Sequence, residues 1–190
     1  ASLGQARAKA RDSKRVQDLI QVRNALELFY SDFGYYPVPT VSRVGGFSTC
    51  WDCDPLAGGG IADFGIDVTR LGGGDPPGLG GYYDGLETNI KNTVYLKPRP
   101  ADPLVSSLGY FDNEVRGYWY MTNGSSNSPD YKLAIVGTWE GSTTAIPAGF
   151  IHDPNFMLNS VSNAGDHDKT ISISSSGAKC WTMESSAPCP

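Results

Sequence analysis

Four cysteines, Cys50, Cys53, Cys180 and Cys189, are the residues whose type and spacing point most directly to chemistry. An even number of cysteines in a chain rich in Gly, Ser and Asn favours disulfides formed in an oxidising compartment. The C-x2-C at Cys50 is also half of a four-cysteine zinc site, but Cys180 and Cys189 are too far apart to be the second close pair. We therefore predict disulfides. Cys50 and Cys53 can pair with each other or cross to the tail.

The other candidate reactive groups give little support for catalysis. Both histidines, His152 and His167, lie in polar loop sequence, and no serine lies in a GxSxG motif. The CWDC stretch lacks the strand–helix context of a thioredoxin-like motif. The glycine runs between residues 38 and 92 lack the GK[ST] ending of a phosphate-binding loop. We predict that the chain is not an enzyme.

Asp166 and Asp168, in NAGDHDKT, place two carboxylates on one side of an extended segment. The segment does not match an EF-hand loop, and two aspartates alone are too few for the six to eight oxygen ligands of calcium. Taken alone, the segment is most simply interpreted as a solvated acidic turn.

The first 32 residues contain no proline and one glycine, which predicts a long helix. Residues spaced three and four apart form one stripe from position 16 onward: Val16, Leu19, Ile20, Arg23, Leu26, Phe29, Tyr30 and Phe33. Residues 1–15 have alanines and charges but, apart from Leu3, no large apolar residue. We therefore expect the second half of the helix to lie on a core and the first half to project.

The helix is predicted to end in the stretch LELFYSDFGYYP. Gly34 can adopt the left-handed conformation that ends a helix, and Pro37 prevents the helix from resuming. Five aromatic residues surround this end, and we expect them to anchor the exit of the helix against whatever covers it: Phe29, Tyr30, Phe33, Tyr35 and Tyr36.

Strands are predicted after the helix, at residues 117–121, 131–139 and 170–174, with a short fourth at 179–183. The first two are aromatic-rich and flank a turn-forming Asn/Gly/Ser stretch, which is typical of an antiparallel hairpin. The expected fold class is therefore α+β, with a long N-terminal helix packed on an antiparallel sheet of about three or four strands and with long loops.

The 190 residues are expected to form one domain. Within it we assign residues 1–33 to the N-terminal helix, 38–92 to a loop-rich excursion, 93–140 to the hairpin of the sheet and 141–190 to a C-terminal region. Residues 1–23 carry a net charge of +4, and the remaining residues carry −9. A mostly acidic body argues against nucleic acid as a partner of the domain as a whole.

The first 37 residues and the stretch YLKPRPADP at 95–103 resemble the type IV pilins and type II secretion pseudopilins. In that family an alanine-and-charge region leads into an amphipathic half-helix, followed by Tyr, polar residues, Gly and an aromatic–Pro pair. The resemblance covers about 80 residues, including the strands of the hairpin. The family's apolar stretch of about 20 residues with its cleavage site is absent, and we expect that a preceding segment was removed.

The resemblance implies a structural subunit of a bacterial surface filament, either a type IV pilus or a type II secretion pseudopilus. Such a subunit is held in the inner membrane by the missing N-terminal segment before assembly. It then joins a homo-oligomeric filament outside the cell or in the periplasm. The resemblance leaves open whether the filament serves motility, DNA uptake, adhesion or secretion.

The resemblance also assigns site residues. It implies a C-terminal disulfide loop closed by Cys180 and Cys189, and calcium as a candidate cofactor at Asp166 and Asp168. The basic residues of the helix front would lie at the membrane boundary or against acidic groups of neighbouring subunits, which makes the following four a candidate subunit interface: Arg7, Arg11, Lys14 and Arg15.

A rival interpretation is a secreted adhesin or carbohydrate-binding module. It would use exposed tryptophans, for which the chain offers Trp51, Trp119, Trp139 and Trp181.

Overall fold

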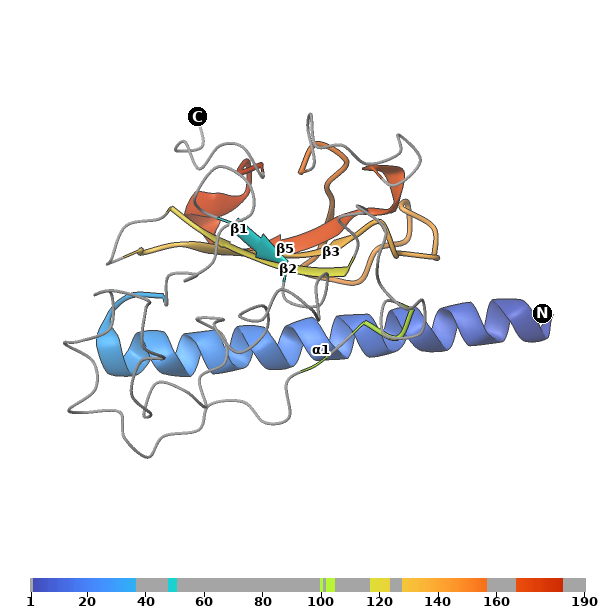
Figure 1. Ribbon diagram of the computed structural model, residues 1–190, viewed down its shortest axis with the longest axis horizontal. Coiled ribbons are helices and arrows are strands. Elements are labelled where there is room, and N and C mark those ends of the chain that lie inside the picture. The colour runs from blue at the N-terminus through green and yellow to red at the C-terminus, as the bar shows by residue number, and fades with distance from the viewer. Residues whose placement is uncertain are drawn as a thin grey trace, which may run out of the picture.

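A computed structural model shows one long helix lying along one face of a five-stranded antiparallel sheet (Figure 1). It describes residues 2–36, 48–50, 100, 102–104, 117–123, 128–156 and 167–182. The elements are α1 (Leu3–Phe33), β1 (Ser48–Cys50), β2 (Gly117–Thr122), β3 (Tyr131–Val136), β4 (Ile151–His152) and β5 (Ile171–Ser174), with short 3-10 helices η2 (His167–Lys169) and η3 (Ser176–Ala178). The strand order is β1-β2-β3-β5-β4. The predicted α+β class is confirmed.

Both ends of α1 are capped by the residues next to it. The hydroxyl of Ser2 accepts a hydrogen bond from the Gln5 N–H, and the Gln5 side chain accepts one from the Ser2 N–H, which is a capping box. At the other end Gly34 has a left-handed conformation (φ 77°), and its N–H donates to the carbonyl of Tyr30. The predicted end of the helix is therefore confirmed.

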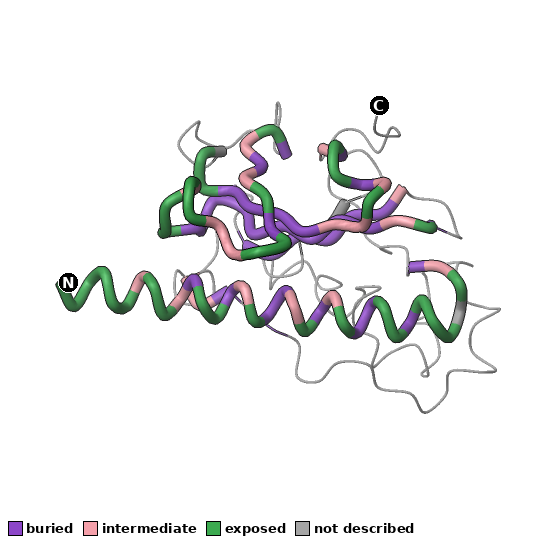
Figure 2. The backbone as a smooth tube through the Cα atoms, turned by 180° about the vertical axis from the view of Figure 1, so that it is seen from behind, coloured by how far each residue is buried: buried purple, intermediate pink, exposed green. Residues whose placement is uncertain are grey.

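The buried side of α1 is a stripe with alternating three- and four-residue spacing: Asp12, Arg15, Leu19, Val22, Leu26 and Phe29. The predicted stripe differed, because Val16, Ile20 and Arg23 are only partly buried. Two neighbouring stripes of a helix satisfy the same spacing, and the contact with the sheet selects between them. The selected stripe extends into charged residues, so burial begins at Asp12. Before that point nearly all residues are exposed (Figure 2).

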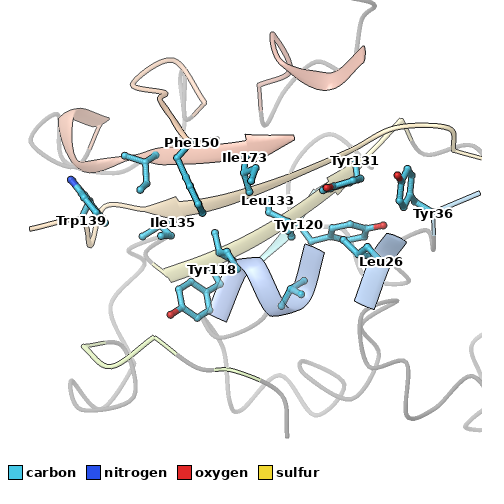
Figure 3. Packing of buried hydrophobic residues seen from close by; sticks show 13 residues of the cluster. Leu26, Tyr36, Tyr118, Tyr120, Tyr131, Leu133, Ile135, Trp139, Phe150 and Ile173 are labelled. Atoms are coloured by element: carbon cyan, nitrogen blue, oxygen red, sulfur yellow. The ribbon is translucent and has the colours of Figure 1, made fainter. Parts of the chain in front are cut away.

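The sheet is buried on both faces. Side chains alternate along β3, so that Tyr131, Leu133 and Ile135 join the core shared with α1. Figure 3 shows this core, with Leu26 of the helix beneath Tyr120. Ala134 and Val136 belong to a second cluster on the opposite face, with these partners: Trp119, Met121, Phe156, Ala178 and Trp181.

Three of the predicted strands are present as β2, β3 and β5. The prediction at 179–183 was wrong where the structure describes it, because a turn follows η3 and only Thr182 makes an isolated bridge. β1 and β4 were not predicted, since two or three residues are too few to show alternation. The excursion at 38–92 lies outside the described residues except for β1. Within the described residues, no helix combines the length and apolar character needed to cross a bilayer.

Candidate functional site

The four basic residues predicted as a subunit interface lie on α1 in different surroundings. Arg7 and Lys14 are exposed, Arg11 is partly exposed, and Arg15 is fully buried. The expectation that residues 1–15 have nothing to bury is therefore wrong at Asp12 and Arg15, which are both buried. The reason is that Asp102 and Glu140, which lie in the part of the chain after α1 (called the head below), pair with Arg15, and Glu140 also pairs with Arg11.

Arg15 is the centre of a buried ion network. Its Nε lies 2.8 Å from Oδ2 of Asp102 and its Nη2 lies 3.1 Å from Oδ1, which is a bidentate pair. Its Nη1 donates to Asp12 at 2.6 Å and to Glu140 at 3.0 Å. All hydrogen-bonding nitrogens of the guanidinium are thus directed at carboxylates.

Asp102 is equally well satisfied. It accepts hydrogen bonds from the hydroxyl of Thr138 and from the backbone N–H of Leu104, each at 2.8 Å. These come in addition to the two bonds from Arg15. The network therefore joins α1 to two segments that are far away in the sequence, the turn at 102–104 and the residues that follow β3. The Pro-Ala-Asp-Pro stretch belongs to the resemblance described above, but the role of its aspartate was not predicted.

The outer edge of the network is the pair of Arg11 and Glu140. Both Nε and Nη2 of Arg11 donate to the Glu140 carboxylate, and the Glu140 backbone N–H donates to Asp12 at 3.2 Å. The hydrogen bond from Arg11, with further help from Arg15, holds the pKa of Glu140 below its usual value. The pKa of Asp12, in contrast, is raised, because burial disfavours its charged form.

The charge state of Arg15 depends on the balance between its burial and its acidic partners. Burial alone would lower its pKa, but the hydrogen bond and charge of Asp102, followed by Glu140 and Asp12, raise the pKa above the usual value. Arg15 is therefore a permanent cation in the interior, and it requires its acidic partners.

The network fixes the position of α1 along its own axis. Displacing the helix by three residues in either direction would bring a carboxylate, Asp12 or Asp18, to the position of the Arg15 guanidinium and against Asp102. Asp18 is itself held, because the Tyr118 hydroxyl donates to it at 2.9 Å and Lys14 Nζ lies 2.7 Å away. The arrangement therefore sets the register of the helix on the head.

The aromatic residues at the helix exit form the second attachment. The rings of Tyr30 and Tyr36 lie 4.6 Å apart, and Tyr36 lies 4.6 Å from Tyr131 of β3 in an edge-on contact. The Tyr36 hydroxyl donates to Glu27, and its backbone N–H donates to the carbonyl of Ser128. The predicted anchoring is confirmed for these residues. The side chain of Phe33 lies outside the described part.

The predicted disulfides are described only in part. Cys180 is disulfide-bonded, and no cysteine in the described part of the chain is free. Cys50 lies in β1 with its side chain outside the description, and Cys53 and Cys189 lie outside it altogether. The pairing of Cys180 with Cys189 stays a prediction.

The candidate calcium ligands are also only partly described. Asp168 lies exposed in η2, while Asp166 is outside the described residues. Among the residues that the structure places, no cluster of three or more His, Cys, Asp or Glu side chains could hold a metal ion. The calcium site stays a prediction.

The tryptophans of the rival interpretation that the structure describes are not exposed. Trp119, Trp139 and Trp181 have 0%, 5% and 3% of their surface exposed, respectively, and Trp51 lies outside the described residues. The expectation of exposed tryptophans was wrong for these three because they fill the two cores of the sheet.

Comparison with known proteins gives no match: no family model fits the chain, and neither a curated protein nor a solved structure is significantly similar to it.

Proposed function

We propose that this chain is a structural subunit of a bacterial surface filament of the type IV pilus or type II secretion pseudopilus kind. The observation that carries the proposal is the way α1 is held. Its second part is fixed to the head by the apolar stripe, the Arg15 network and the aromatic exit. Its first turns extend past the sheet with their side chains exposed (Figures 1 and 2).

This arrangement suits a subunit that transmits force. A load on the exposed end of α1 would reach the sheet through two separate attachments, one at Arg15 and one at Tyr36. The disulfide at Cys180 would add a covalent tie in the C-terminal region. In this proposal the partners are other copies of the subunit, and an apolar segment before Ala1 places the chain in the inner membrane before assembly.

The exposed basic residues at the start of α1 supply the charged contacts of the proposed interface. Arg7 and Lys9 are exposed in the first turns, whereas Arg15 is occupied by the head. Reversing Arg15 to glutamate would place a carboxylate against Asp102 and unfold the junction, so it cannot report on assembly alone. The interface is better tested by Arg7→Glu with Lys9→Glu.

The experiment uses the chain fused behind an apolar segment of about 20 residues in cells with a pilus assembly machine. We expect the double reversal to reduce filament yield strongly while leaving the thermal melting of the head unchanged. The matched control reverses two exposed lysines elsewhere, Lys169→Glu with Lys179→Glu. A normal filament yield from the Arg7 and Lys9 reversal would show that the basic front is only a solvated helix face.

The rival function, a carbohydrate-binding module, loses its supporting observation. Three of the four tryptophans on which it depended are core residues, and the fourth, Trp51, lies outside the described residues.

A further inference from the structure

The start of β3 places an acid and a base two residues apart, Asp130 and Lys132. Because alternate residues of a strand share a face, both side chains lie on the side of the sheet opposite α1. There they meet one segment, residues 175–181, which we call the strap. It contains η3 and the disulfide-bonded Cys180.

The side chain of Lys132 is hydrogen-bonded to backbone carbonyls in the C-terminal half of the strap. Its Nζ donates to the carbonyls of Lys179 at 3.0 Å and Trp181 at 2.5 Å, the residues on either side of Cys180. The third contact is an ion pair with Asp153 at 2.6 Å. The ammonium thus has three acceptors for its three protons, and its side chain has no exposed surface. The hydroxyl of Ser172 donates to the same carboxylate of Asp153 at 2.6 Å.

Asp130 binds the first half of the strap as a hydrogen-bond acceptor, whereas Lys132 acts as a donor. Its carboxylate accepts hydrogen bonds from the Ser175 hydroxyl at 2.6 Å and from the Gly177 N–H at 3.2 Å. The approach is so close that a Cβ at position 177 would lie 2.3 Å from Asp130 Oδ2. Only glycine fits there without displacing the carboxylate.

The strap also covers apolar surface. Ala178 and Trp181 are buried with Trp119 and Phe156 in the second cluster of the sheet. Lys132 lies over the ring of Phe156, 5.3 Å from its centre, so the charged and apolar contacts are continuous.

We propose that Asp130 and Lys132 form a clamp that keeps the strap docked on the sheet whether or not the disulfide of Cys180 is intact. The disulfide then closes on a segment that is already in place, because the residues on both sides of Cys180 are held by Lys132. Reduction removes a covalent tie but leaves the clamp and the apolar contacts. The inference does not depend on the filament proposal.

The test compares amide hydrogen exchange of Gly177, Ala178 and Trp181 in the oxidised and the reduced full chain. For the wild type we expect protection to change by less than about threefold on reduction, because the bonds that define the docked strap persist. For reduced Gly177→Ala we expect exchange at these amides to be at least about tenfold faster, since the displaced carboxylate loses its bonds to the strap. Exchange at Leu133 reports on the sheet and should not change.

Two controls make the result specific. Ser176→Ala alters an exposed neighbour in η3 and should behave as the wild type. In an Asp130→Ala background no carboxylate lies against the added Cβ of residue 177. Gly177→Ala should therefore add little to the effect of Asp130→Ala alone. If Gly177→Ala does not fold, Ser175→Ala takes its place in the comparison, because this variant removes one hydrogen bond to the same carboxylate.

The Lys132 half of the clamp is tested with Lys132→Met against Lys179→Met, which changes an exposed lysine of the strap. In the reduced state only the first should release the strap. Two results would overturn the proposal: loss of protection in the reduced wild type to the level of reduced Gly177→Ala, or retention of protection in both clamp variants.

Discussion

Arg15 and Asp102 form a bidentate ion pair in which neither side chain has any exposed surface. The two residues are separated by 87 positions in the sequence, and the pair joins the long helix to the head. Burying such a pair is costly unless every donor and acceptor is satisfied. Here Thr138, Leu104, Asp12 and Glu140 complete the hydrogen bonds. The pair therefore specifies where the helix lies more than it adds net stability.

Removing the cation should strongly destabilise the protein. Arg15→Met leaves Asp102 buried without its counter-charge, and we expect the free energy of unfolding to fall by about 3–5 kcal/mol. Urea denaturation followed by far-UV circular dichroism measures this change. Lys14→Met, one position earlier on the exposed side, should change stability by less than about 1 kcal/mol. Equal effects of the two substitutions would contradict the role assigned to Arg15.

The Glu140 carboxylate should make stability depend on acid pH. Because the hydrogen bond from Arg11 lowers its pKa in the folded state below the usual 4.5, its stabilising contribution is fully present above that pH. The contribution is lost as the pH falls through the lower folded pKa. Glu140→Gln lacks it, so the stability difference between wild type and variant, about 1 kcal/mol or less at pH 7, should shrink below pH 4.5.

The comparison with the variant is needed because Asp12 acts in the opposite direction. Burial raises its pKa, so its protonation in acid relieves part of the cost of burying its charge. Denaturant titrations of both proteins between pH 3 and pH 7 separate the two effects. A difference that stays constant over this range would refute the assignment to Glu140.

The core contact of the helix should depend on the stripe that the structure shows. Leu26 is fully buried against the sheet, whereas Leu28 is 58% exposed. Leu26→Ala should cost about 2–5 kcal/mol, and Leu28→Ala should cost well under about 1 kcal/mol. Thermal melting of the two variants side by side checks this. Similar losses would mean that the helix lies on the sheet by another face.

The sequence predicted the elements that have strong local signals. The end of α1 followed from Gly34 and Pro37, and β2, β3 and β5 followed from aromatic and β-branched runs. The network at Arg15 was not predicted, because an arginine in a helix is usually a solvated residue. Only the fold brings Asp102 and Glu140 to it. The same holds for Lys132, a charge within a strand whose partners follow much later in the chain.

The disulfide pairing is a direct chemical prediction. We expect a non-reduced digest to contain a peptide in which Cys180 is bonded to Cys189, and mass spectrometry identifies it. In the chain-entropy model a loop of that size stabilises by about 3 kcal/mol. A bond from Cys180 to Cys50 or Cys53 would refute this pairing and would tie the tail to the region of β1 instead.

The central proposal is that the chain is built into a filament through its exposed helix end. The most direct measurement is immunogold electron microscopy of sheared surface filaments. The filaments come from cells that express the chain behind an apolar segment of about 20 residues together with a pilus assembly machine. The account predicts filaments labelled along their length by antibodies against the folded head. Correctly processed and folded protein that stays in the inner membrane, with unlabelled filaments, would contradict it.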